Sequence, residues 1–248
     1  MENWLDRVVA RPLIGIQTLP DVTRSMLVQV LSPVLTQHHG NVDVSLGLAG
    51  IVEFKLVNGF TLRLTPTDVI VQFDYKTTWE SSAGKLKTPV VPEVRPYTEL
   101  LTQALSITSA VVGAMLASSG GSQTSVARVG IVAIADLDPD NLVPGVDLLT
   151  THLGAPWRQR RLAAANATLL ANLDEDNEHV ERCHHGLVFD QAQPENGLKL
   201  TLDWQRAYLP TLPEPRKRFQ GELDACRDRA LAYFQKIGEG ELFDDAAD

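Results

Sequence analysis

The most regular group of chemistry-bearing side chains is a run of aspartates at alternate positions, Asp136, Asp138 and Asp140, with Asp147 eleven residues after the first. A calcium-binding loop has oxygen ligands at alternate positions, a glycine at its sixth position and a bidentate acid at its twelfth. In this chain the sixth position is Asn141 and the twelfth is an aspartate. The run therefore predicts either a divalent-cation site at these four aspartates or a solvated turn after a strand, and the turn is favoured.

The adjacent residues Cys183, His184 and His185 are a second group of potential metal ligands. On a strand, alternate residues face opposite sides of the sheet, so Cys183 and His185 share a face that His184 does not. A zinc site needs four ligands, and no recognised spacing supplies the others. Ordinary strand residues near a turn are the preferred interpretation, and we expect no cofactor.

Nucleophilic and phosphate-binding motifs are not found in the sequence. No Gly-x-Ser-x-Gly elbow is present. The segment 118–122 is rich in serine and glycine but follows an expected helix, whereas a phosphate loop precedes one. Whether the chain is an enzyme is left open by these patterns, with the balance toward a non-catalytic role.

Composition restricts the classes of partner. The chain has 248 residues, a formal net charge of −9 and two cysteines. A net negative charge argues against nucleic acid or an anionic membrane as the main partner, although basic clusters at 158–161 and 216–218 would allow a local patch. The N-terminus lacks the apolar core of a signal peptide, and the weakly polar run 104–117 is too short to span a bilayer. We therefore expect a cytoplasmic protein that does not bind membranes.

The elements that would position these side chains centre on residues 97–135. Apolar residues recur at spacings of three and four over 97–117, which predicts a long helix buried on more than one side. The run 126–135 has almost no polar residue, as expected for a central strand covered on both faces. Asn58-Gly59 lies between alternating segments and predicts a hairpin.

The other elements follow from periodicity in the same way. The sequence predicts a helix over 21–37 that Pro33 kinks, a meander of strands over 42–48, 52–56, 60–64 and 69–73, a short helix over 146–153, a hairpin over 180–189 and 198–204, and a final helix over 217–237. Residues 158–173 fit either a helix or a strand. Residues 1–19 show little periodicity, and the proline-rich segment 76–96 reads as a mobile loop that proteases would cut after Lys85 or Lys87.

The strands cluster rather than alternate strictly with helices, which predicts the α+β class: a meander and a second hairpin packed on two long helices around a central buried strand. Residues 1–240 form a single domain in this interpretation, or two lobes over 1–125 and 126–240, followed by an acidic tail at 241–248. The sequence shows no internal repeat.

The segment Arg128-Val-Gly130 in its strand, together with the helix 219–234, resembles a bacterial family of proteins known as the TIGR04255 family. The resemblance is one of layout, over about residues 50–235: a meander, a helix, an Arg-Ile-Gly type of strand and a closing aliphatic and aromatic helix. The family has no established activity, so the resemblance implies a bacterial accessory protein and assigns no catalytic residue.

The final helix carries more apolar residues than a helix packed on one side usually needs, among them Leu231 and Phe234. These two side chains either pair two copies of the chain as a homodimer or cover the second hairpin within one chain. We therefore expect a non-catalytic binding or interaction protein whose partner is another protein or a second copy. The alternative is a hydrolase that uses a divalent cation at Asp136, Asp138 and Asp140.

Overall fold

The structure is a computed structural model that describes residues 3–19, 24–40, 42–47, 50–56, 58–75, 78–80, 88–90, 93–118, 124–138, 140–158, 164–190 and 197–241. In chain order its elements are η1 (Trp4–Arg7), β1 (Val9–Leu19), α1 (Arg24–His39), β2 (Val42–Leu46), β3 (Val52–Leu56), β4 (Phe60–Leu64), β5 (Asp68–Phe73), β6 (Thr78–Glu80), β7 (Thr88–Val90), α2 (Tyr97–Ser118), β8 (Ser125–Leu137), α3 (Pro144–Arg158), β9 (Ala164–Glu175), β10 (His179–Asp190), β11 (Gly197–Tyr208) and α4 (Pro215–Glu239).

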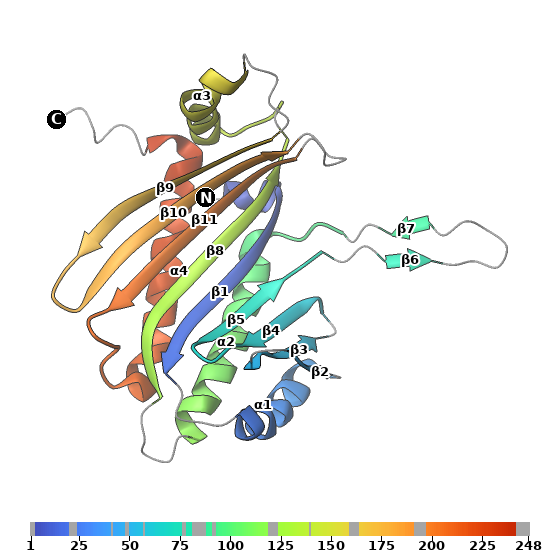
Figure 1. Ribbon diagram of the computed structural model, residues 1–248, viewed down its shortest axis with the longest axis vertical. Coiled ribbons are helices and arrows are strands. Elements are labelled where there is room, and N and C mark those ends of the chain that lie inside the picture. Colours follow the sequence, from blue (N-terminus) through green and yellow to red (C-terminus); the bar gives the residue numbers. More distant parts are fainter. Residues whose placement is uncertain are drawn as a thin grey trace.

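Nine of these strands form one antiparallel sheet in the order β2-β3-β4-β5-β1-β8-β11-β10-β9. Helix α2 packs on β1 and β5, α4 packs beside it on β8 and β11, α1 packs on α2, and α3 contacts α4 at one end of the sheet. Figure 1 looks onto the opposite face of the sheet, with α2 and α4 behind the strands. The predicted α+β class is confirmed.

Helix α2 begins where the sequence predicts because its first turn is capped from outside the helix. Asp6 accepts hydrogen bonds from the backbone N–H of Thr98 (2.8 Å) and from the Thr98 hydroxyl (3.0 Å), so a carboxylate lies at the positive end of the helix. The Tyr97 hydroxyl donates to the carbonyl of Val132 at 3.2 Å and joins α2 to β8. Among the described residues, α2 is the one helix that length and composition alone would allow to cross a membrane, a test that a buried core helix also passes.

The chain contains a repeat of topology that the sequence analysis did not predict. β1, α1, the strands β2 to β5 and α2 make one half, and β8, α3, the strands β9 to β11 and α4 make the other. The two halves join where β1 pairs with β8, with Gly15 directly opposite Gly130. The signal that both halves share is short, Gly15-Ile16 and Gly130-Ile131, which is why it does not stand out in the sequence.

Three further segments differ from expectation or settle an open point. β1 is a long strand despite Pro12, because its pairing with β5 begins only at Leu13 and no ladder bond to β5 is lost at the proline. Of residues 158–173, for which the sequence allows a helix or a strand, residues 164–173 belong to β9. In the segment 76–96, β6 pairs with β7, while Lys85, Lys87 and tail residues 242–248 lie outside the described residues.

Candidate functional site

The sheet face opposite α2 and α4, which we call the uncovered face, carries no described helix (Figure 1). Residues of β1 and β8 at its centre are apolar or lack a side chain. Leu13 lies opposite Val132, Gly15 opposite Gly130, and Ile134 follows at the next position along this face. Val132 is buried and Leu13 and Ile134 are half-buried although no helix covers them. The uncovered face therefore has an apolar centre that is shielded mainly by its own neighbours.

Ion pairs lie on this face around that centre. At one end Arg11 of β1 and Lys199 of β11 both approach Asp136 of β8, with N···O distances of 3.0 and 3.8 Å. On the first half of the sheet, Arg63 of β4 pairs with Glu53 of β3 at 2.8 Å. Arg63 has an acid of its own, whereas Arg11 and Lys199 share Asp136, so each of these cations lies beside an acid on the same face.

The opposite end of the centre is a row of polar side chains from four strands, β5, β8, β11 and β10, with β1 between β5 and β8. Arg128 of β8 donates to Gln205 of β11 at 3.2 Å and lies 3.9 Å from Asp68 of β5. Gln205 in turn donates to Asp203 at 2.7 Å, and Asp203 lies opposite His184 of β10 in the ladder. Burial raises the pKa of Asp203 above its ordinary value, against the hydrogen bond from Gln205 that stabilises the ionised form.

The four predicted metal ligands are not brought together as a cation site. Asp136 is held by Arg11 and Lys199 on the uncovered face. Asp138 and Asp140 are exposed in the turn that follows β8, where the Asp138 carboxylate accepts from the backbone N–H of Asp140 at 3.0 Å. Asp147 is exposed in the first turn of α3. Among the described residues, no three His, Cys, Asp or Glu side chains are arranged to hold a metal ion.

The Cys183-His184-His185 segment lies on β10 and divides between the two faces as its alternation predicts. Cys183 and His185 are buried under α4, whereas His184 lies on the uncovered face. Burial raises the pKa of the Cys183 thiol and lowers the pKa of His185 to about 4. The His185 ring stacks on Tyr233 of α4, whose hydroxyl lies 3.1 Å from Nε2. A neutral thiol enclosed in the core is a poor nucleophile.

A buried ionic cluster, which the sequence did not predict, lies between α4 and the second half of the sheet. Arg206 of β11, 6% exposed, donates to Glu181 of β10, 2% exposed, through Nε (2.9 Å) and Nη2 (2.5 Å). It also donates to Glu222 of α4 at 2.9 Å, and Arg229 of α4 reaches Glu181 at 3.2 Å. The available signal is alternation: Glu181 is two residues from Cys183 in the expected strand 180–189, and Arg206 is two residues from Trp204, just beyond the end of the expected strand 198–204.

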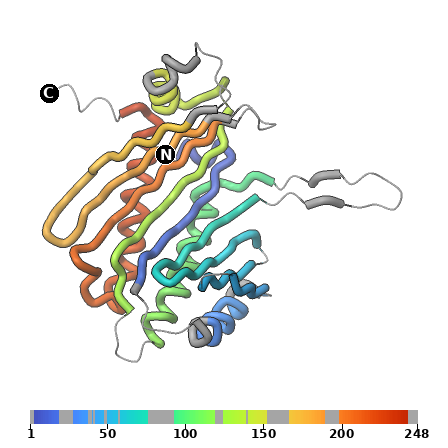
Figure 2. The backbone as a smooth tube through the Cα atoms, in the orientation of Figure 1, coloured from blue at the N-terminus to red at the C-terminus, as the bar shows by residue number. Residues whose placement is uncertain are grey.

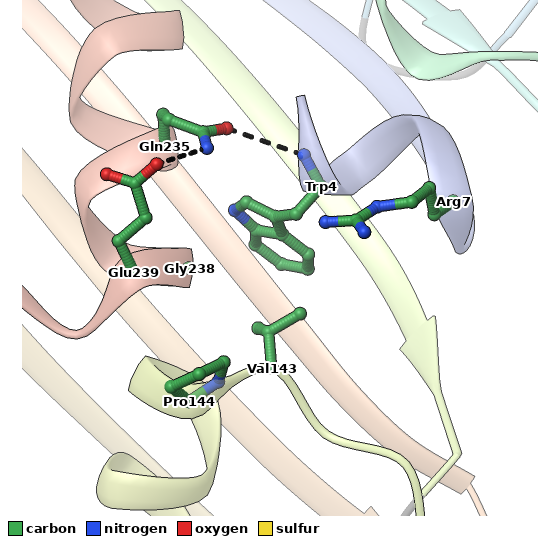
Figure 3. A pocket seen from close by; sticks show the side chains of 7 residues that line it. All are labelled: Trp4, Arg7, Val143, Pro144, Gln235, Gly238 and Glu239. Atoms are coloured by element: carbon green, nitrogen blue, oxygen red, sulfur yellow. Dashed lines mark hydrogen bonds between the residues drawn. The ribbon is translucent and has the colours of Figure 1, made fainter. Parts of the chain in front are cut away.

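A pocket of about 500 Å³ lies at the end of the sheet where η1 meets α3 and α4 (Figure 3). Its polar atoms are largely used within the chain. The Trp4 indole N–H donates to the carbonyl of Phe234 at 2.7 Å. The Gln235 side-chain oxygen accepts from the backbone N–H of Trp4 at 3.4 Å, and the Gln235 side-chain nitrogen donates to Glu239 at 2.6 Å. Gly238 permits this approach, since a Cβ there would overlap the Trp4 ring. These hydrogen bonds join η1 to α4 beside the pocket, and Arg7 of η1 also lines it.

The two residues predicted to pair two chains lie on α4, which packs on its own sheet. Phe234 is 0% exposed within one chain, so its side chain is not available to a second copy. Leu231 is half-buried and packs against the core. The extra apolar residues of α4 are explained by its contacts with α2, α3, β8 and β11. Phe234 therefore packs within its own chain, which is the alternative to pairing two copies of the chain.

No protein-family model matches the chain, and no curated protein matches it. Neither finding bears on the resemblance to the TIGR04255 family, which stays a prediction.

Proposed function

We propose that the chain is a non-catalytic binding protein of the bacterial cytoplasm, and that the uncovered face binds a protein partner. The observation that carries this proposal is the arrangement of that face: an apolar centre around Leu13, Val132 and Ile134 with ion pairs around it. Stable protein–protein interfaces have this anatomy, with an apolar core depleted of charge and a polar rim.

The charges on the uncovered face indicate the chemistry of the partner. Arg11, Arg63 and Arg128 each lie within 3.9 Å of an acid, so they do not form the basic field that a polyanion needs. A protein surface that presents an apolar patch with few charges would fit the centre without leaving a charge buried and unpaired. We therefore favour a protein over a nucleic acid as the partner.

Acid–base groups on the face do not favour catalysis. His184 and Asp203 lie opposite one another on an open sheet surface, and Asp203 is already bonded to Gln205. The nearest cysteine in sequence, Cys183, points to the other face and is buried. The hydrolase alternative finds no support in the described positions of Asp136, Asp138 and Asp140.

Capture followed by titration tests the proposal. The tagged chain is used to capture proteins from a lysate of cells that express it natively, and each captured protein is purified and titrated by calorimetry. Ile134→Asp should raise the dissociation constant by roughly tenfold or more, because binding would then bury a charge in the apolar centre. Leu148→Asp on α3 is the matched control, since Leu148 is also an apolar residue reached by solvent. It should leave the constant unchanged.

Two results would contradict the proposal. One is a partner whose affinity is lost in Leu148→Asp and kept in Ile134→Asp, which would move the surface away from the sheet. The other is a chain that binds duplex DNA with a steep salt dependence and retains no protein, which would replace the protein partner with a polyanion.

A further inference from the structure

The outer edge of the second half of the sheet is the strand β9. It is twelve residues long, it pairs with β10 on one side, and no described strand pairs with its other side. Figure 2 shows it as the gold outermost strand, joined to β10 by a short turn. Its sequence from 164 to 173 contains no charged residue and no proline. Leu170 at its middle is 53% exposed.

The opposite edge, β2, differs in the ways that normally prevent edge pairing. It is only five residues long and carries Asp43. Natural sheets protect their edges with short strands, charges, prolines or bulges, because an unpaired row of N–H and C=O groups otherwise accepts another strand. β9 has a register shift only near its C-terminal end, next to Glu181 and Arg182 of β10. Residues 164–172 are therefore an unprotected edge.

The two halves of the chain differ at this same place. Beyond its central strand β1, the first half has four strands, β5 to β2, whereas beyond β8 the second half has three, β11 to β9. The outer side of β9 is the position at which the first half has one more strand. We propose that a second copy of the chain fills it: two copies pair through β9, antiparallel about a two-fold axis at Leu170, and form one continuous sheet. This inference does not depend on the proposed function of the uncovered face.

Charge favours the antiparallel arrangement of two copies. Asp174 and Glu175 are the charged residues of β9 and lie at its C-terminal end. Parallel pairing in register would place these acids of the two copies side by side. Antiparallel pairing about Leu170 places them opposite Asn166 and Ala165, which carry no charge.

Side chains along the strand fit an axis at Leu170. Residues opposite one another in an antiparallel pair share a face, so the two copies of Leu170 would meet on the uncovered face. Thr168 would then lie opposite Asn172, and Leu169 opposite Ala171 on the helix side. The most exposed apolar side chain of the edge is thereby buried against itself, as a two-fold interface requires.

A charge exchange at the axis tests the proposal on the full chain. Light scattering coupled to size exclusion should give a dimer for the wild type at high concentration. Leu170→Lys and Leu170→Glu should each give a folded monomer, because like charges then face one another across the axis. An equal mixture of the two variants should restore the dimer, because the charges are then unlike. Circular dichroism and the melting temperature of each variant check that it is folded.

Leu46→Lys is the matched control, since Leu46 is a 75% exposed leucine on the opposite edge strand. It should leave the wild-type dimer intact. A wild-type chain that is monomeric at high concentration overturns the proposal. So does a dimer that survives both single changes at Leu170, a mixture that stays monomeric, or a dimer that is lost in Leu46→Lys instead.

Discussion

The two faces of the sheet are made from alternate residues of the same strands, yet they treat charge in opposite ways. On the covered face Arg206 and Glu181 are enclosed between strand and helix, where they compensate each other together with Glu222 and Arg229. On the uncovered face, pairs such as Arg63–Glu53 are partly reached by water. Charge on the covered face is enclosed within the fold, whereas charge on the uncovered face stays within reach of water.

The largest expected difference between the faces is in their ion pairs. Arg206→Met should lower the free energy of unfolding by about 3 kcal/mol or more, because it leaves the buried Glu181 carboxylate short of its main partner. Arg63→Met should lower it by about 1 kcal/mol or less, because the pair with Glu53 is partly exposed and solvent weakens it. Urea unfolding followed by circular dichroism at pH 7 measures both.

Equal losses of unfolding free energy in Arg206→Met and Arg63→Met would contradict the difference between the two faces. That outcome would mean either that water reaches Glu181 in solution or that Arg229, which lies 3.2 Å from Glu181, compensates the carboxylate without help. Arg229→Met in the Arg206→Met background distinguishes these explanations, since only the second predicts a further loss.

The second expected difference between the faces is in how much a buried apolar side chain contributes to the free energy of unfolding. Ile131 and Ile134 are the same residue type on the same strand, but Ile131 is 0% exposed beneath the helices and Ile134 is half-buried on the uncovered face. Ile131→Ala should cost about 3 kcal/mol, since it removes buried methylene groups and leaves a cavity. Ile134→Ala should cost about 1 kcal/mol, because little apolar area is lost. The midpoints of urea unfolding compare the pair directly, and a larger loss for Ile134→Ala would reverse the assignment of the faces.

Most elements of this fold follow from local periodicity. Helix α2 was predicted to within one residue at its C-terminal end, and the four meander strands to within two, because apolar residues repeat there at helical or strand spacing. β1 was not predicted, because residues 1–19 show little periodicity and include Pro12. Only the register with β5 shows that the proline falls outside that ladder.

The candidate site was largely beyond the sequence for a different reason. The run 126–135 predicts a strand covered on both faces, yet in β8 Gly130, Val132 and Ile134 face away from the helices. They are apolar because neighbouring strands shield a central strand even without a helix above it. Pairing of β1 with β8 joins residues more than a hundred positions apart, and no local pattern specifies such a contact.

The two adjacent histidines of β10 lie on different faces, with His185 on the covered face and His184 on the uncovered face. Burial, followed by the charge of His184, lowers the pKa of His185 in the folded chain to about 4 from the ordinary 6.5. Between these values the unfolded chain binds a proton at His185 that the folded chain does not. The contribution of His185 to the free energy of unfolding is therefore fully present above pH 6.5 and is lost as the pH falls toward 4.

From pH 8 to pH 5 the wild type should lose about 2 kcal/mol of unfolding free energy through His185. His185→Leu should lose less over the same range by about that amount, since its apolar neighbours Leu169 and Leu202 lie opposite it in the ladders and the proton site is gone. His184→Gln keeps His185 and should keep most of the pH dependence. Asp203 titrates in the wild type and in His185→Leu alike, and its raised pKa acts in the opposite direction, so the difference between these two chains isolates His185; in His184→Gln the pKa of Asp203 loses the lowering by His184. Urea unfolding at half-unit steps of pH measures each slope. If His184→Gln flattened the curve while His185→Leu did not, the titrating histidine would be on the uncovered face, and the assignment of charge to the two faces would be wrong.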